Sequence, residues 1–395
     1  MRAIVLHIEV GDFFTAAVER CYPYLRGRAF VVAPSHPTRA RVYAASPPAR
    51  AAGIRQGMLV KDAQDYERRL IIHPVDEELY AAIYREMVKI LSFFSPVIEP
   101  WRYGRVYLEI MRQQKWAQAQ DAAYRIQKEM ERRLGLKPAV GLGSNKLISR
   151  AASTRAVKRA EILWVPPGHE QPFIAPFRVQ FLPHVTQKMT SLLNNLNVWQ
   201  ARDLLGFTRR HLQTLFGDVG WRIYDEARGI DSTPVMPPEK QSALYEGWLF
   251  VPETNDVEVI TDTVRVLAGR LARRLREMSM LAGRLKLSVW FADGRRISGQ
   301  NACQPPARYE AELWRAAEPL VDRLLTRRVA VYRLALRAFQ CRPAGQQDLF
   351  APETPEKWSR LAEAMDKIKA RYGENAIQTV KQSRLGGTRC LNVLR

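Results

Sequence analysis

Two charged residues lie at the ends of apolar runs that are typical of buried β-strands. Glu9 closes the run at 3–10 (AIVLHIEV), and Arg105 opens the alternating run that ends the stretch 99–110 (EPWRYGRVYLEI). A carboxylate at the end of a strand can bind a hard cation such as Mg²⁺, whereas a guanidinium carries a permanent positive charge. Because a buried arginine without a partner is costly, the sequence predicts a carboxylate close to Arg105.

The composition indicates a polyanionic partner. The chain has 395 residues, of which 61 are Lys or Arg and 40 are Asp or Glu, so its formal charge is +21. This excess is larger than solubility requires, and nucleic acid is the leading candidate for the partner. A basic surface that reflects genome composition or a high growth temperature is the alternative. With 47% apolar residues, the chain can fold about two to four domains.

The cysteines and the N-terminus argue against several other classes. The four cysteines are scattered, without a CxxC pair, so the sequence predicts neither a zinc site nor a disulfide framework. The apolar run at the N-terminus is short and meets Gly11 and Asp12, which is typical of neither a signal peptide nor a membrane span. We therefore expect a cytoplasmic protein.

Strands and helices are predicted to alternate up to a Pro-rich stretch at 163–183. The expected elements of this first part are strand 3–10, helix 13–20, strand 28–33, helix 76–93, strand 103–110 and helix 116–134. Residues 187–229 have an entirely helical pattern and are followed by a second Pro-rich stretch at 231–240. The predicted fold class is α/β with several domains.

Residues 243–341 are predicted to form another α/β unit, with strands at 284–291 and 329–338 and an excess of Lys and Arg. A small basic module can neutralise DNA phosphates and release their counterions. An ordinary solvated surface is the alternative. The candidate DNA contacts in this unit are Arg270, Arg273, Arg274 and Lys286. The segment after it, 342–395, contains QQDLF (346–350), one charged helix at 355–371 and an end without a pattern.

Six motifs together resemble the Y-family of translesion DNA polymerases. In the order of that family they are HIEVGDFFTAAVER (7–20), VYAASPPARAAGIRQGM (42–58), VGLGSNKLISRAAS (140–153), FLPHVTQKMTSLLNNLNVWQARDLL (181–205), ARGIDSTPV (227–235) and QQDLF (346–350). No single motif suffices, but their common order over most of the chain is not expected by chance.

The resemblance implies an α/β, multidomain fold of the right-hand type. The implied domains are a palm (1–10 and 76–165), fingers (11–75), a thumb of the helix-hairpin-helix type (166–235), an α/β little finger that binds DNA (242–341) and a tail with a clamp-binding peptide and one helix (342–395).

The resemblance also implies a degenerate metal site. In the family, an Asp on the first palm strand and an Asp-Glu pair in a motif like SIDEAYLD hold two Mg²⁺ ions for phosphoryl transfer. Matching RYGRVYLE to that motif sets the pair against Gly104 and Arg105, and the first Asp is replaced by Glu9. We expect Arg105 to take the place of the metal and to neutralise Glu9. No catalytic residue and no cofactor is then expected.

Two further carboxylates could have replaced the missing pair. Asp12 is expected to cap the helix that begins at Phe13, and Glu109 lies too far along its strand from Arg105. An active translesion DNA polymerase with an unusual metal site, which would need Mg²⁺, remains the alternative interpretation.

The resemblance implies remnants of a nucleotide pocket. Phe14 falls at the steric gate, although an aromatic residue there is equally expected for packing. Arg50 is retained from the family's Tyr-Arg pair, and Arg150 replaces the palm Lys; either could instead be a surface charge. In the thumb, His184 and Thr186 replace glycines whose amides approach a DNA phosphate in the family.

Lys188 remains in the thumb as a candidate phosphate contact, and the tail carries the candidate clamp contacts. In QQDLF these are Gln346, Asp348, Leu349 and Phe350. Packing of Leu349 and Phe350 back onto this chain is the alternative.

The preferred interpretation is a catalytically inactive homologue similar to the ImuB-type mutasome subunit. Such an adaptor binds DNA at a primer-template or single-strand/duplex junction, and the bacterial sliding clamp, in translesion synthesis and induced (SOS) mutagenesis. The resemblance implies an error-prone replicative-type polymerase and a RecA-like accessory protein as further partners, no membrane, and a location in the bacterial cytoplasm at the nucleoid. A DNA-binding module unrelated to clamps is a third interpretation.

Overall fold

The computed structural model describes residues 4–33, 40–110, 116–237, 243–293, 295–344, 361–362, 364–368 and 371. The chain divides into two compact units, Met1–Arg28 with Glu78–Pro238 and Ala29–Glu77 with Glu239–Arg395. Within the described residues, every helix is too short or too polar to cross a membrane.

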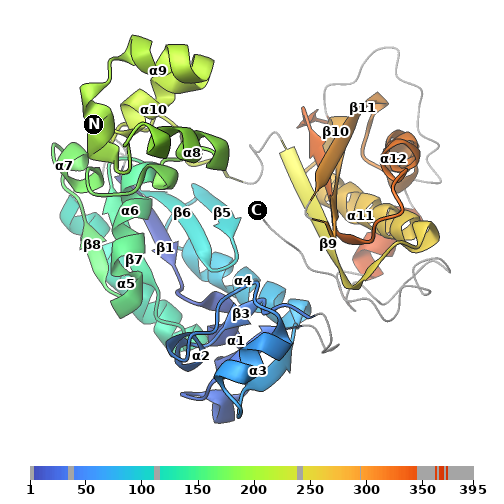
Figure 1. Ribbon diagram of the computed structural model, residues 1–395, viewed down its shortest axis with the longest axis horizontal. Coiled ribbons are helices and arrows are strands. Elements are labelled where there is room, and N and C mark those ends of the chain that lie inside the picture. The colour runs from blue at the N-terminus through green and yellow to red at the C-terminus, as the bar shows by residue number, and fades with distance from the viewer. Residues whose placement is uncertain are drawn as a thin grey trace. The chain divides into compact units, whose positions relative to one another are not determined.

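The first unit is built on a five-stranded sheet of order β5-β6-β1-β7-β8 (Figure 1). Its strands are β1 (Ile4–Glu9), β5 (Ile98–Arg102), β6 (Arg105–Ile110), β7 (Ala139–Gly143) and β8 (Ile162–Trp164). The central strand β1 is buried along its whole length, as its apolar sequence predicts, and it runs antiparallel to both β6 and β7. In this register Glu9 is paired with Arg105 and His7 with Tyr107.

Two helices cover opposite faces of this sheet. Helix α5 (Trp116–Leu134) and helix α6 (Lys146–Ala156) both contact β1, β7 and β8, so they must lie on different sides. Helix α6 packs closely against β7, because a side chain at Gly141 would come within 2.0 Å of the Ser149 carbonyl oxygen. Since Gly141 is paired with His7, the face that carries His7 and Glu9 is the face under α6.

Residues 11–28 belong to the same unit as the sheet, whereas we expected them in the fingers. They form helix α1 (Phe13–Cys21) and the 3-10 turn η1 (Pro23–Leu25). The reason is aromatic packing: Phe13 stacks on Tyr103 with ring centroids 5.8 Å apart, and Phe14 meets Tyr80 of helix α4 (Glu77–Ser92) at 5.1 Å. Such ring pairs add to the stabilisation from apolar burial.

Asp12 occupies the N-cap position of α1, but its side chain makes no capping hydrogen bond to the described helix. Its backbone is left-handed, with φ of 52°. An N-cap residue needs an extended backbone to aim its side chain at the amides of the first turn, so the capping role that we expected for Asp12 is wrong.

The helical segment that follows is broken into short pieces. It contains 3-10 turns and the helices α7 (Glu170–Ile174), α8 (Gln187–Asn195), α9 (Arg209–Phe216) and α10 (Gly220–Glu226). The turns η3 (Val179–Phe181), η4 (Ala201–Gly206) and η5 (Gly217–Val219) interrupt it, whereas η2 (Val157–Arg159) lies before it, between α6 and β8. The entirely helical pattern predicted over 187–229 is confirmed, and capping residues such as Thr186 and Thr208 divide it into separate short helices.

The second unit contains a small sheet of order β3-β2-β4. Its elements are β2 (Phe30–Ala33), β3 (Ala44–Ala45), helix α2 (Pro47–Ala51), helix α3 (Val60–Tyr66) and β4 (Ile71–Pro74). The Ser46 hydroxyl accepts a hydrogen bond from the Ala49 amide and so caps α2.

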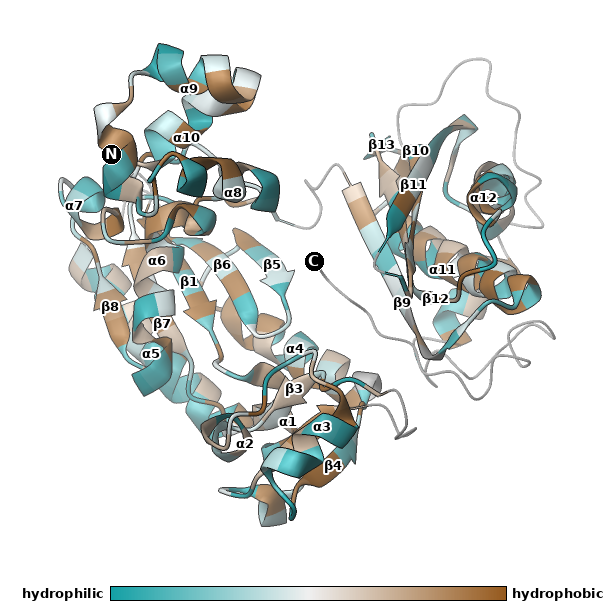
Figure 2. Ribbon diagram, viewed as in Figure 1, coloured by the Kyte–Doolittle hydropathy of each residue, from teal (hydrophilic) through white to brown (hydrophobic). Residues whose placement is uncertain are grey.

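A four-stranded sheet of order β11-β10-β12-β9 forms the C-terminal part of the second unit. Its elements are β9 (Ala243–Thr254), α11 (Val257–Glu277), β10 (Met280–Phe291), β11 (Arg296–Ala307), α12 (Glu310–Leu324), β12 (Val331–Phe339) and the short β13 (Arg342–Pro343), which pairs with β10. Both helices pack on one face of this sheet around a common apolar core (Figure 2).

The strands predicted at 284–291 and 329–338 are confirmed as the main parts of β10 and β12. The QQDLF peptide lies outside the described residues, as does most of the helix predicted at 355–371. Of that helix, residues 361–362, 364–368 and 371 are described and are helical.

Candidate metal-site remnant and nucleic-acid interface

The ion pair expected between Glu9 and Arg105 is present. The Arg105 Nη2 atom lies 2.6 Å from Glu9 Oε1, across the β1–β6 pair. The Glu9 side chain is 4% exposed, whereas that of Arg105 is 38% exposed, because β6 begins at a hairpin turn. Arg105 is thus less buried than we expected, and the buried charge is that of Glu9. The guanidinium thus contacts Oε1, an oxygen through which Glu9 would bind a cation.

The other oxygen of Glu9 is also engaged, in a buried network that the sequence did not reveal. The Ser153 hydroxyl on α6 donates to Glu9 Oε2 at 3.2 Å, and His7 Nδ1 lies 2.6 Å from the same hydroxyl oxygen. The same hydroxyl also lies 2.9 Å from the Arg150 carbonyl oxygen, so when His7 donates from Nδ1 the one serine proton is shared between that carbonyl and the Glu9 carboxylate. Burial lowers the pKa of His7 well below its ordinary value, and Arg105 lowers it further. The imidazole is therefore neutral at pH 7.

The neutral state of His7 predicts a loss of stability in mild acid. Its pKa is lower in the folded chain than the ordinary 6.5 of an unfolded one, so below about pH 6.5 the unfolded state takes up the proton first. We expect the free energy of unfolding to fall by up to about 1.4 kcal/mol per pH unit there. His7→Asn should remove this part of the slope in urea denaturation between pH 5 and 7. An unchanged slope in that variant would contradict the assignment.

Gly104 lies in the tight turn between β5 and β6 and has no room for a side chain. Its φ is +75°, and an added Cβ would lie 2.7 Å from Phe13 Cβ. A carboxylate at this position would therefore need both a different backbone and a displaced Phe13. With a glycine at 104 and an arginine at 105, the residues present do not fit a two-metal carboxylate site.

No group of three or more His, Cys, Asp or Glu side chains that could hold a metal ion occurs within the described ranges. Glu99 of β5, an acidic group on the strand next to β6, is held by Lys146 Nζ at 2.7 Å and by the Met236 amide at 2.7 Å. This second ion pair, which the sequence reasoning missed, ties β5 to α6 and to residues past α10.

The expected nucleotide-pocket residues belong to both units of the chain, and each has its own partners. Phe14 belongs to the aromatic cluster of the first unit, which agrees with the packing alternative. Arg50 lies on α2 of the second unit, where its guanidinium donates to the Ala45 carbonyl at 3.1 Å. Arg150 on α6 donates to the Phe181 carbonyl and stacks over the Phe181 ring at 4.3 Å. Its guanidinium thereby joins α6 to the start of the helical segment.

In the stretch 181–205, where a helix-hairpin-helix was predicted, the backbone amide of His184 has a partner inside the protein. The His184 amide donates to Glu226 Oε2 at 3.3 Å, and the His184 ring bonds the other oxygen of the same carboxylate. Burial raises the pKa of Glu226, while the hydrogen bond from His184 opposes that shift. Thr186 instead caps α8 through its hydroxyl. The amide at 184 is thus used inside the protein, and Lys188 is exposed on the first turn of α8.

The open face of the C-terminal sheet is basic and aromatic. Leucines at alternate positions of β10 and β12 face α11 and α12, so the residues between them face the other way. On the open face, the cross-strand positions carry Tyr245 of β9, Arg333, Arg337 and Phe339 of β12, Arg284, Lys286 and Trp290 of β10, and Arg296 of β11. None of the cross-strand positions on this face, from β9 to β11, is acidic.

Trp290 lies at one end of this basic face, between Arg296 of β11 and Arg333 of β12. The guanidinium carbons of Arg296 and Arg333 each lie 4.6 Å from its ring centroid, and Arg333 also donates to the Tyr245 hydroxyl at 3.0 Å. Cation–π contacts hold the two guanidinium groups in place without neutralising them. Pre-positioned positive charge of this kind suits a phosphate backbone.

Of the DNA contacts predicted from the sequence in this unit, only Lys286 lies on the open face. Helix α11 packs on the opposite face, and two of its three predicted arginines have acidic partners: Arg274 pairs with buried Glu246 at 2.7 Å, and Arg273 pairs with Glu277 at 2.9 Å. Arg270 lies over the Trp248 ring. The sequence reasoning missed Arg284, Arg296, Arg333 and Arg337, although the alternation in RLKLSVW and VYRLALRAF carries the signal for most of them.

The architecture described above is that of the Y-family DNA polymerases. A Y-family DNA polymerase chimera of Dbh and Dpo4 aligns with a TM-score of 0.71 at 19% identity, over 85% of this chain and 98% of that chain. The insertion ternary complex of Dbh DNA polymerase aligns with a TM-score of 0.64 at 20% identity and the same coverage.

The chain belongs to the impB/mucB/samB family. The model of that family matches residues 8–154, and the model of its C-terminal domain matches residues 249–349, which together span more than half of the chain. A DNA polymerase IV of Desulfatibacillum aliphaticivorans is 26% identical over 380 residues, which is 95% of this chain and 96% of that protein. A DNA polymerase IV of Halorhodospira halophila is 28% identical over 357 residues, or 89% of this chain and 99% of that protein.

Proposed function

We propose that this chain is a Y-family polymerase homologue that binds DNA and has lost nucleotidyl transfer. The observation that supports the loss is the substitution of the metal-binding pair by Gly104 and Arg105, with Arg105 Nη2 at 2.6 Å from Glu9. A guanidinium cannot be deprotonated at physiological pH, so it competes permanently with any cation at Glu9. The space at Gly104 is taken by Phe13. The residues at this site therefore do not support metal-assisted nucleotidyl transfer.

The DNA-binding part of the proposal rests on the open face of the C-terminal sheet. Its five Lys and Arg side chains lie on three adjacent strands among aromatic rings, with no acidic residue at the paired positions. Positive groups in a row along a sheet can follow a phosphate backbone and release its counterions. Binding through phosphates alone is independent of sequence, which suits a protein that acts at damaged or irregular templates.

A matched pair of variants tests this surface. We expect Arg284→Ala/Lys286→Ala/Arg333→Ala/Arg337→Ala to weaken binding to a fluorescent primer-template about 10- to 100-fold at 0.1 M salt, and to lower the slope of log K against log salt by about 0.9 for each lost phosphate contact. Arg270→Ala/Arg273→Ala removes two charges from α11 on the other face and should change the affinity less than threefold. Equal losses in the two variants would place the interface elsewhere.

We further propose that QQDLF binds the bacterial sliding clamp and that the chain acts as an adaptor in translesion synthesis and induced mutagenesis. The support is the sequence, in which Gln346, Leu349 and Phe350 follow closely after β13 ends at Pro343. The peptide itself lies outside the described residues. That an error-prone polymerase and a RecA-like protein are further partners, as the resemblance implies, stays a prediction.

Replacement of the two apolar residues tests the clamp proposal. Leu349→Ala/Phe350→Ala should abolish co-elution with a bacterial sliding clamp in gel filtration, because both anchors of the peptide are removed. The same variant should bind primer-template DNA with unchanged affinity. Co-elution that persists would place clamp binding outside QQDLF, and an unchanged chain that does not co-elute would favour a DNA-binding module whose function is unrelated to clamps.

A further inference from the structure

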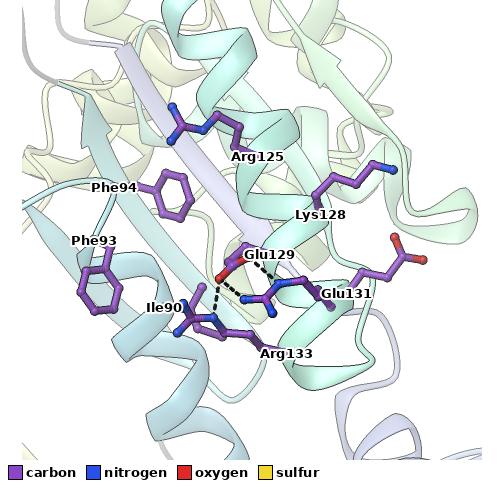
Figure 3. Close-up of a pocket in the computed structure, with 9 residues that line it drawn as sticks. Ile90, Phe93, Phe94, Arg125, Lys128, Glu129, Glu131 and Arg133 are labelled. Atoms are coloured by element: carbon purple, nitrogen blue, oxygen red, sulfur yellow. Dashed lines mark hydrogen bonds and ion pairs between the residues drawn. The ribbon is translucent and has the colours of Figure 1, made fainter.

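A groove with a volume of about 680 Å³ lies between the end of α4 and the exposed side of α5 (Figure 3). Three apolar residues at the end of α4 form one side of it, and six charged residues of α5 form the other. Helix α5 covers the sheet face opposite to α6, so the groove is separate from the Glu9–Arg105 pair and from Arg150.

The apolar side of the groove exposes an aromatic ring. Phe93 is 73% exposed, which is more than any other large apolar side chain described in the structure, while Ile90 beneath it is 1% exposed. Phe94, beside Phe93, is partly buried. A ring that is exposed to this degree next to a buried aliphatic floor can bury further apolar area when a partner side chain packs on it.

The charged side of the groove has a net positive charge. Glu129 accepts hydrogen bonds from both Arg132 and Arg133, and the two arginines, Arg132 most strongly, lower the pKa of Glu129 to about 2. Glu129 is thus ionised and neutralised within the groove. The other acidic residue, Glu131, points away from the phenylalanines (Figure 3).

Two exposed cations remain on the charged side. Lys128 stands over the Tyr124 ring at 5.5 Å, so it is oriented without being neutralised. Arg125 has Asp121 at 3.7 Å, but both side chains of that pair are more than 60% exposed, so their attraction is weak. These cations are available to a partner that carries negative charge.

We propose that this groove binds a segment of a partner protein in which acidic residues flank an aliphatic or aromatic anchor. The anchor packs against Phe93 and Phe94, and the flanking carboxylates pair with Arg125 and Lys128. A nucleic acid is a poorer match, because its continuous backbone would bring phosphates close to Glu131 as well, whereas a peptide can place its few carboxylates at Arg125 and Lys128 alone.

Selection from a random 12-residue peptide display library on the full-length chain tests the proposal. We expect the enriched peptides to contain at least two Asp or Glu residues next to Leu, Ile, Phe or Trp. Synthetic copies should bind at least tenfold more weakly to Phe93→Ser and to Arg125→Glu/Lys128→Glu in fluorescence anisotropy. Trp164→Ser and Lys158→Glu/Arg159→Glu, which change an exposed ring and two exposed charges elsewhere in the same unit, should bind them as the unchanged chain does.

Three results would overturn the proposal. Enriched peptides that are basic or uncharged, or that bind the groove variants as well as the control variants, would show that the groove does not select acidic segments. A loss of affinity for a labelled single-stranded oligothymidine in Phe93→Ser alone would assign the groove to nucleic acid. A fall in sedimentation coefficient in Phe93→Ser, from dimer to monomer, would assign it to a second copy of the chain.

Discussion

Replacement of Arg105 by alanine is expected to lower the free energy of unfolding of the first unit by about 2 to 3 kcal/mol, because the Glu9 carboxyl group then stays buried without its charged partner. The value lies below that of a fully buried pair because the Arg105 side chain is 38% exposed. Urea denaturation followed by tryptophan fluorescence measures the change, since Trp101 lies near the pair.

Two further variants separate the ion pair from general effects of losing an arginine. Glu9→Gln in the Arg105→Ala background should recover about half or more of the lost stability, because a neutral amide is cheaper to bury than an unpaired carboxylate. Arg159→Ala removes an arginine whose side chain is 82% exposed and should change stability by less than about 0.5 kcal/mol. If Arg105→Ala is as harmless as Arg159→Ala, the pair is not what stabilises Glu9.

Replacement of Gly104 by alanine is expected to destabilise the chain by about 3 kcal/mol or more. A left-handed backbone alone costs a non-glycine residue about 1 to 2 kcal/mol, and here the new Cβ would also lie 2.7 Å from Phe13 Cβ. Phe13 is 4% exposed and stacked on Tyr103, so it has little freedom to move away.

Gly27 provides the matched control for Gly104. Its φ is +72°, close to that of Gly104, but no described atom lies within 4 Å of an added Cβ. Gly27→Ala should therefore show only the backbone cost, and the difference between the two variants measures the contact with Phe13. Equal effects at both positions would mean that the β5–β6 turn can relax. In that case the turn could also accommodate a carboxylate side chain at position 104.

Much of this site was predictable from the sequence because both halves of it are local patterns. The apolar run that ends at Glu9 and the alternation after Arg105 each indicate a strand, and the motif order sets the two strands side by side. The hairpin strand β5 was missed because Pro100 interrupts its pattern. The buried partners His7 and Ser153 could not be predicted, because they are 146 residues apart and meet only through the packing of α6 on the sheet.

The proposed DNA-binding surface shows a different limit. The helix pattern of α11 separates its apolar stripe from Arg270, Arg273 and Arg274, but it does not reveal that Glu246 on β9 neutralises Arg274. The strand alternation of β10 and β12 does separate the buried leucines from the exposed basic residues. Period-two patterns therefore separate the basic open face from the core better than the density of arginines does.

Primer extension by the purified full-length chain tests the loss of nucleotidyl transfer most directly. The protein is supplied in excess over a labelled primer-template with Mg²⁺ or Mn²⁺, and a gel shift on the same preparation shows that it binds the DNA. We expect binding without the addition of a single nucleotide, since Arg105 and Gly104 stand where the metal-binding pair is required. Extension that disappears in Glu9→Ala would contradict this account, because it would mean that Glu9 still holds a catalytic metal ion.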